Sequence, residues 1–76
     1  MKWVVNTYID TNKGKKSIKS AIFNNYEDAK NYYWANKESE RRMGKYLELK
    51  CYKDKNEIDK LTIEMIKNGY GLPKLY

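Results

Sequence analysis

The chain has 76 residues, and its 16 basic against 10 acidic side chains give a net charge of +6. It has no histidine and a single cysteine, Cys51. These two facts exclude an intrachain disulfide, the common zinc sites and histidine-based acid–base or nucleophilic catalysis. We therefore expect a non-enzymatic protein without a metal or cofactor, folded as one domain over residues 1–76.

Aliphatic residues are few, whereas eight tyrosines and two tryptophans are present. Aromatic rings must therefore supply much of the buried area, at about 150–250 Å² for each ring. So thin a core is often completed by association of two chains, and a homodimer stays open at this point.

The N-terminal stretch, KWVVNTYID, alternates in the manner of a strand. It reaches polar residues too soon for a signal peptide or a membrane span, so we expect a cytoplasmic protein that does not interact with a membrane. One face of this strand carries Trp3, Val5, Thr7 and Ile9, and the other carries Val4 and Tyr8.

The next segment, DTNKGKK, predicts a turn because Asn12 and Gly14 tolerate a positive φ. The stretch SIKSAIF then returns as a second strand. Ile18 and Ile22 lie on one face of it, and Ala21 and Phe23 lie on the other. Together the two strands predict a hairpin.

Residues 24–44 predict a helix. Asn24 followed by Glu27 fits a capping pattern, and Gly44 is a typical stop after two arginines in the last turn. The stretch YLELKCY follows as a third strand, whose Leu47, Leu49 and Cys51 are expected to face this helix as part of the core.

The last third is ambiguous. A helix beginning near Asp54 and stopping at Gly69 aligns four apolar residues but leaves Ile63 outside their stripe. A strand would alternate Leu61, Ile63 and Met65 instead. The helical stripe comprises Ile58, Leu61, Met65 and Ile66. The helix is preferred, which gives an α+β fold of order ββαβα, with ββαββ as the alternative. In either case a small antiparallel sheet has one face covered by helix.

Three consecutive aromatics in the first helix, Tyr32, Tyr33 and Trp34, span about 200° of its circumference. The apolar arc of the helix is centred on Ala29 and also takes in Met43. Tyr32 and Tyr33 fall within this arc, whereas Trp34 lies about 150° from its centre. Trp34 is therefore predicted to face outward.

The neighbours of Trp34 on the outer face are Lys30, Lys37 and Arg41. An exposed indole in a row of cations suits a single-stranded nucleic acid, whose bases stack on the ring while its phosphates meet the charges. The same residues would serve as a hot spot for a protein partner. A third interpretation packs Trp34 against the edge of the fold and leaves the lysines only to solvate the helix.

A second basic cluster, formed by Lys13, Lys15 and Lys16, lies in the turn between the first two strands and could hold phosphates. A lysine-rich turn is also common for solubility alone. We expect a basic binding module whose partner is a nucleic acid or an acidic protein surface, with nucleic acid preferred. The alternative function is a small protein-binding inhibitor or regulator acting on a host protein complex, of the kind that phages and other mobile elements encode.

Overall fold

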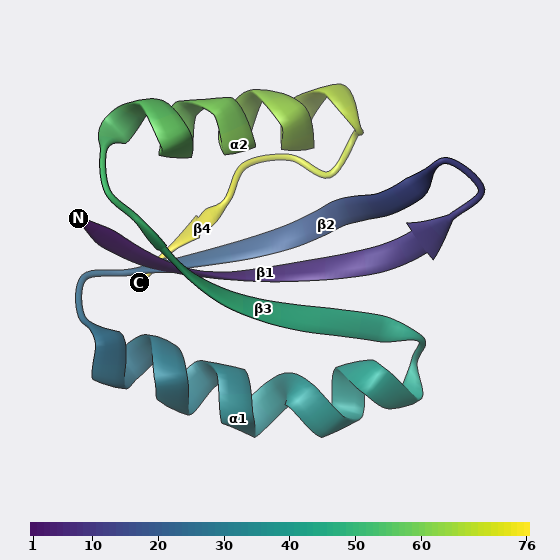
Figure 1. The fold of residues 1–76 in the computed structure, drawn as a ribbon, viewed down its shortest axis with the longest axis horizontal. Coiled ribbons are helices and arrows are strands. Elements are labelled where there is room, and N and C mark those ends of the chain that lie inside the picture. The colour runs from purple at the N-terminus through teal and green to yellow at the C-terminus, as the bar shows by residue number, and fades with distance from the viewer.

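The structure is a computed structural model that describes residues 1–76. A four-stranded sheet lies between two helices, with α1 on one face and α2 on the other (Figure 1). The elements are β1 (Lys2–Thr11), β2 (Gly14–Phe23), α1 (Tyr26–Arg42), β3 (Lys45–Tyr52), α2 (Lys55–Lys67) and β4 (Lys74–Leu75). The predicted α+β class and the order ββαβα are confirmed, and β4 is a short addition at the end of the chain.

The strands are ordered β3-β1-β2-β4 across the sheet. β1 is antiparallel to both of its neighbours, and β4 runs parallel to β2. The β1–β2 register shifts after Thr7, so that Lys19 pairs with Thr7, Ser17 pairs with Tyr8 and Ile18 is the extra residue of a bulge. This hairpin is the long central unit to which β3 and β4 are added.

The core is divided between the two faces of the sheet. The adjacent residues Val4 and Val5 point to opposite faces, yet their exposed fractions are 0% and 1%. Val5 belongs to the cluster under α1 and Val4 to the cluster under α2. The predicted helix-covered face is the one under α1, and the structure adds a second covered face under α2.

α1 begins one residue later than expected. Asn25, and not Asn24, caps it, because the Asn25 Oδ1 accepts a hydrogen bond from the backbone N–H of Asp28 at 2.9 Å. The predicted inclusion of Met43 in the apolar arc is wrong, because the helix ends at Arg42 and the Met43 side chain is exposed. The C-terminal part of the arc is instead occupied by Glu40, which is only 7% exposed.

The ambiguous last third is a helix, so the strand alternative is wrong. Asp54 caps α2 by accepting from the backbone N–H of Glu57 at 3.1 Å, and Gly69 follows its end with a φ of 82°. Leu61 and Met65 are buried as predicted, but Ile66 is 54% exposed and does not belong to the stripe. Neither helix is long and apolar enough to cross a membrane.

β3 has the predicted faces. Leu47 and Leu49 pack against the cluster under α1, while Tyr52 on the other face is buried under α2. The prediction that Cys51 is part of the core is only partly correct, since Cys51 lies near the end of the outermost strand and is half-buried.

The last residues of the chain return to the sheet. The backbone N–H of Tyr76 donates to the carbonyl of Ile22 at 2.9 Å, and the Tyr76 ring stacks on Phe23 at 4.7 Å between centroids. The C-terminal segment therefore completes the sheet edge beside β2.

Candidate functional site

Trp34 faces outward from α1, as the helical periodicity predicts. Its exposed fraction is 61%, the largest for any aromatic side chain of the chain. One residue earlier, Tyr33 turns inward and packs against the core cluster. The two rings meet edge to face at 5.2 Å, so the half-buried Tyr33 supports the exposed indole from one side.

Lys37 lies beside this aromatic pair. Its Nζ is 4.8 Å from the centroid of the Trp34 ring and 5.4 Å from that of Tyr33. Both distances are within the range of a cation–π interaction. No carboxylate lies within ion-pair distance of Lys37 or of Lys30, which is on the same outer face one helical turn earlier than Trp34. These two cations are therefore available to a negatively charged ligand.

Arg41 differs from the two lysines. Its guanidinium is 3.2 Å from the Glu38 carboxylate, with both side chains largely exposed. A surface pair of this kind is weak and exchanges readily with another anion, so it lowers the local positive charge without locking the arginine. The predicted row of Lys30, Trp34, Lys37 and Arg41 is present on one helix face, and we refer to these four residues as the α1 row.

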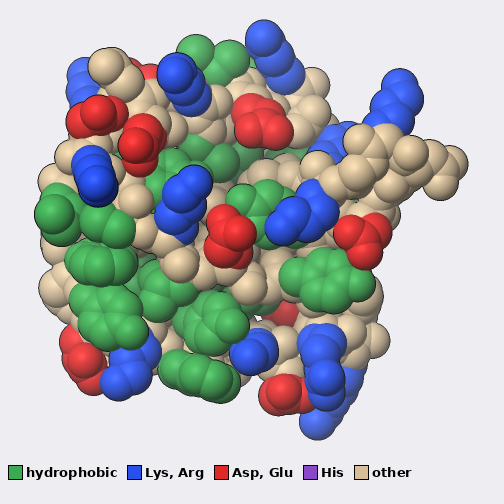
Figure 2. All heavy atoms as spheres, viewed as in Figure 1, with side chains coloured by type: hydrophobic (Ala, Val, Ile, Leu, Met, Phe, Trp, Pro, Cys, Tyr) green, Lys and Arg blue, Asp and Glu red, His purple; other side chains and the backbone are tan.

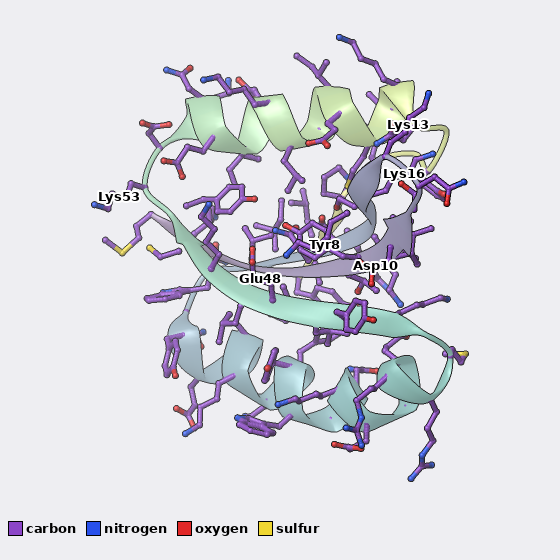
Figure 3. The ribbon with its side chains drawn as sticks, turned by 45° about the vertical axis from the view of Figure 1, so that its right-hand side comes forward. Tyr8, Asp10, Lys13, Lys16, Glu48 and Lys53 are labelled. Carbon is purple, nitrogen blue, oxygen red and sulfur yellow. The ribbon has the colours of Figure 1, made fainter.

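The three turn lysines lie elsewhere. Lys13 and Lys16 project from the tip of the β1–β2 hairpin near the C-terminal end of α2 (Figure 3). A hollow of about 560 Å³ separates the hairpin tip from Glu64 of α2 and from Asn68, which follows that helix, and Lys15 also lines it. Since α1 covers the opposite face of the sheet, the predicted binding residues form two separate groups.

Two of these lysines are already engaged with aromatic rings. The Lys15 Nζ lies 4.8 Å from the centroid of Tyr8, and the Lys16 Nζ lies 5.2 Å from that of Tyr70. Lys13 has no such contact, and its backbone N–H donates to the Thr11 hydroxyl within the turn. The hairpin tip is therefore a second basic surface, and the Tyr70 ring beside Lys16 is 41% exposed, less than the ring of Trp34.

A buried polar cluster between the sheet and α2 was not found from the sequence. The Ser20 hydroxyl donates to the Asn6 Oδ1 at 2.6 Å, and the Asn6 amide donates to the Tyr52 hydroxyl at 3.1 Å. Beside them, the Tyr8 hydroxyl donates to the Glu48 carboxylate at 3.3 Å (Figure 3). Burial, and then the charge of Glu48, raise the pKa of Tyr8 to about 12.

A cavity of about 320 Å³ lies next to this cluster, and Tyr8, Tyr52 and Leu61 contribute to its walls. Ser17 also lines it, at 3% exposure and with no hydrogen-bond partner for its hydroxyl. Alternation of polar and apolar residues along β1 could have indicated a polar face at Asn6 and Tyr8. The closure of that face by α2 depends on contacts between segments far apart in the sequence.

The acidic side chains and Cys51 do not form a metal site, since no three of them lie close together. Neither a protein-family model, a curated protein nor a solved structure matches this chain. Function must therefore be inferred from the α1 row, the hairpin tip and the polar cluster themselves.

Proposed function

We propose that the protein is a non-enzymatic binding module that holds single-stranded nucleic acid on the α1 row. The observation that carries the proposal is the 61% exposed ring of Trp34 with the Lys37 ammonium 4.8 Å from its centroid. Stacking needs a ring that solvent can reach, and the backbone of the ligand needs a cation beside that ring. The α1 row offers both on a rigid element.

The remaining residues of the row extend this arrangement along the helix. Lys30 and Arg41 are separated by about 16 Å along the helix axis at 1.5 Å per residue. Trp34 and Lys37 lie between them. A strand running along α1 would therefore meet a cation on either side of the stacked base. Contacts of this kind give sequence-tolerant binding that weakens steeply as salt rises.

The overall charge favours the same ligand. The chain carries +6, and the basic hairpin tip adds a second surface that attracts phosphates from a distance. In this proposal the tip contributes to the rate of encounter, whereas Trp34 and Lys37 hold the bound strand. Removing charges from either place lowers affinity, but only loss of the Trp34 ring removes the stacking.

The test is a titration of fluorescently labelled single-stranded DNA and RNA homopolymers, followed by anisotropy at several salt concentrations. Trp34→Ala is expected to weaken binding by about 1–3 kcal/mol, the range for one stacked base. Changing Lys30, Lys37 and Arg41 together to alanine is expected to weaken binding further and to flatten the dependence on salt.

The matched control for the triple variant replaces Lys53, Lys55 and Lys67 by alanine. These three lysines are exposed and lie before or on α2, so the control removes the same net charge without altering the α1 row. Equal losses in the two triple variants would show that only net charge matters. No binding at low salt by the unmodified protein would refute the nucleic-acid proposal.

A protein partner is the second candidate, and one observation favours it. The Arg41–Glu38 pair places both signs of charge next to the exposed Trp34. Aromatic residues and arginine dominate the energetics of protein interfaces, while an acid in the row repels phosphate. A protein inhibitor or regulator would use the same residues, and its affinity would depend on Trp34 with a much smaller effect of salt.

A further inference from the structure

We propose that β3 is the interface of a homodimer, in which the β3 strands of two chains pair antiparallel and join the two sheets into one. This inference goes beyond the proposed function and does not depend on it. It rests on an unpaired strand edge and on the side chains that this strand would place opposite one another.

β3 is an open edge of eight residues. It pairs only with β1, and none of the backbone hydrogen bonds outside regular elements involves residues 45–52. Every second residue of β3 therefore directs an N–H and a C=O away from the sheet. The other end of the sheet is closed by the two-residue β4, which is a common way to protect an edge. β3 has eight residues and is not shortened in this way.

The view in Figure 2 is the same as in Figure 1, with β3 in front. Hydrophobic side chains form a band on this face, over the beginning of α1 and the end of β3. Tyr46, near the start of the strand, is also exposed. The edge is thus accompanied by apolar surface that a second chain could cover.

The two faces of β3 restrict how two copies can pair. Residues directly opposite in an antiparallel pair lie on the same face of the sheet. Leu47, Leu49 and Cys51 face α1, so an odd residue must oppose an odd residue and an even residue an even one. Consequently only registers in which the two residue numbers add up to an even sum keep both cores continuous.

Charge then selects one register among the central ones. If the numbers of opposing residues add up to 96, Glu48 lies opposite Glu48 of the second chain. If they add up to 100, Lys50 lies opposite Lys50. If they add up to 98, Glu48 lies opposite Lys50 at two symmetric positions, and Leu49 of both chains lies on the two-fold axis. Opposite charges across a strand pair are favourable, and like charges are unfavourable.

The same register suits the rest of the strand. It places Tyr46 opposite Tyr52 and Leu47 opposite Cys51, so aromatic meets aromatic and apolar meets apolar. Only Lys45 of β3 is left outside the pairing. A two-fold interface requires a strand that matches a second, antiparallel copy of itself in charge, in side-chain size and in which side chains point to each face.

The dimer has a consequence for the α1 row. A continuous sheet formed by antiparallel edge pairing keeps the α1 side of one chain on the same side as that of the other. The two α1 helices would then lie on one face of an eight-stranded sheet, with two copies of Trp34. A ligand that spans both rows would gain from the higher effective concentration of the second site.

The experiment measures the mass of the full chain by light scattering and sedimentation over a range of concentrations. The unmodified protein is expected to reach the dimer mass. Lys50→Glu places Glu opposite Glu at both positions, and Glu48→Lys places Lys opposite Lys. Each single variant is expected to raise the dissociation constant by roughly tenfold or more.

Two combinations distinguish this register from a general effect of charge. An equimolar mixture of the Glu48→Lys and Lys50→Glu chains restores opposite charges at every position, so it is expected to form heterodimers although neither chain dimerises alone. The double variant E48K/K50E is expected to dimerise by itself. Lys55→Glu, an exposed change on α2 with the same charge difference as Lys50→Glu, is the control and is expected to dimerise normally.

Folding of each variant is checked by circular dichroism, because Glu48 accepts a hydrogen bond from Tyr8, whereas Lys50 is exposed and makes no hydrogen bond. In the unmodified protein, alternate amides of β3 are expected to exchange with deuterium more slowly as concentration rises. A monomer at the highest concentration would overturn the proposal. So would a dimer that folded Lys50→Glu leaves intact, or a mixture that forms no heterodimer.

Discussion

The core beneath α1 consists of Val5, Ala21 and Phe23 from the sheet, packed against Ala29 and aromatic rings from the helix. Beneath α2 the same strands bury polar side chains beside the aliphatic ones, linked by hydrogen bonds from Ser20 through Asn6 to Tyr52. The two sides of one sheet are therefore stabilised by different interactions. The α1 side relies mainly on apolar area and ring packing, with the Glu40–Lys19 ion pair at one end, while the α2 side has a hydrogen-bonded polar cluster at its centre.

This difference determines why truncating a side chain destabilises each side of the sheet. Truncating a side chain under α1 leaves a cavity and removes contacts, and the cost scales with the volume lost. Truncating a member of the polar cluster under α2 leaves its partners buried without hydrogen bonds, and the cost is their desolvation. The comparison can be tested by removing one residue from each side.

The largest effect is expected for Phe23→Ala. Phe23 is buried on the α1 side, stacks on Tyr76 and lies 5.4 Å from the ring of Tyr32. Its truncation is expected to lower the free energy of unfolding by about 3–5 kcal/mol, measured by urea denaturation with circular dichroism. Ile63→Ala, at an exposed position of α2, is the control and should change stability by no more than about 0.5 kcal/mol. A loss below 1 kcal/mol for Phe23→Ala would show that the α1 side is not a packed core.

A smaller loss, about 1–3 kcal/mol, is expected for Asn6→Ala, because both Ser20 and Tyr52 would keep buried polar groups without their partner. The double variant N6A/S20A tests the mechanism. This double variant also removes the Ser20 hydroxyl, which Asn6→Ala alone leaves without a partner. It is therefore expected to lose less stability than the sum of the two single variants. Simple additivity would mean that the cluster behaves as ordinary packing, and that the two sides of the sheet do not differ in kind.

The pH dependence of the α2 side gives a third effect. The pKa of Tyr8 is raised from 10.0 to about 12 by burial and by Glu48, so the folded state favours the protonated phenol. Its contribution to stability is fully present below pH 10 and is lost as the pH rises through 12. Because the Tyr8 side chain is partly exposed, solvent screening makes this contribution smaller than that of Asn6.

The measurement is the free energy of unfolding of the unmodified protein and of Tyr8→Phe at several alkaline pH values. The unmodified protein should lose more stability than Tyr8→Phe over the alkaline range. Tyr32, whose pKa is also raised, titrates in both proteins and cancels in the comparison. Parallel curves for the two proteins would show that Tyr8 ionises as freely in the folded state as in the unfolded chain.

Periodicity predicted much of the α1 side. The alternation in β3 placed Leu47 and Leu49 correctly, and the 100° step of the helix separated Tyr33 from Trp34. These patterns are local, because each is read within a single element. The same holds for the end of α2 at Gly69, where a positive φ follows the last helical turn.

Features that depend on distant segments were not predictable in this way. The carboxylate of Glu40, which is buried in the α1 arc, lies 3.4 Å from the ammonium of Lys19, a residue of a different element. The separation of Lys13 from Trp34 onto opposite sides of the molecule likewise follows from the fold and not from either segment alone. The burial of Asn6 required knowing that α2 closes the second face of the sheet.

The smallest effect on stability is expected for Trp34→Ala, since its ring belongs to neither side of the core. A change at an exposed position should alter the free energy of unfolding by no more than about 0.5 kcal/mol.

Trp3 provides the contrast, because it is half-buried on the α1 side and meets Tyr26 edge to face at 4.9 Å. Trp3→Phe leaves Trp34 as the sole indole. Its emission should be red-shifted and open to an aqueous quencher, while the emission of Trp34→Ala should be shielded. If Trp34→Ala unfolds the protein, the ring is part of the core and the α1 row cannot be a binding surface. If it leaves stability intact and weakens nucleic-acid binding, the exposed ring has no structural role and acts as part of the binding surface.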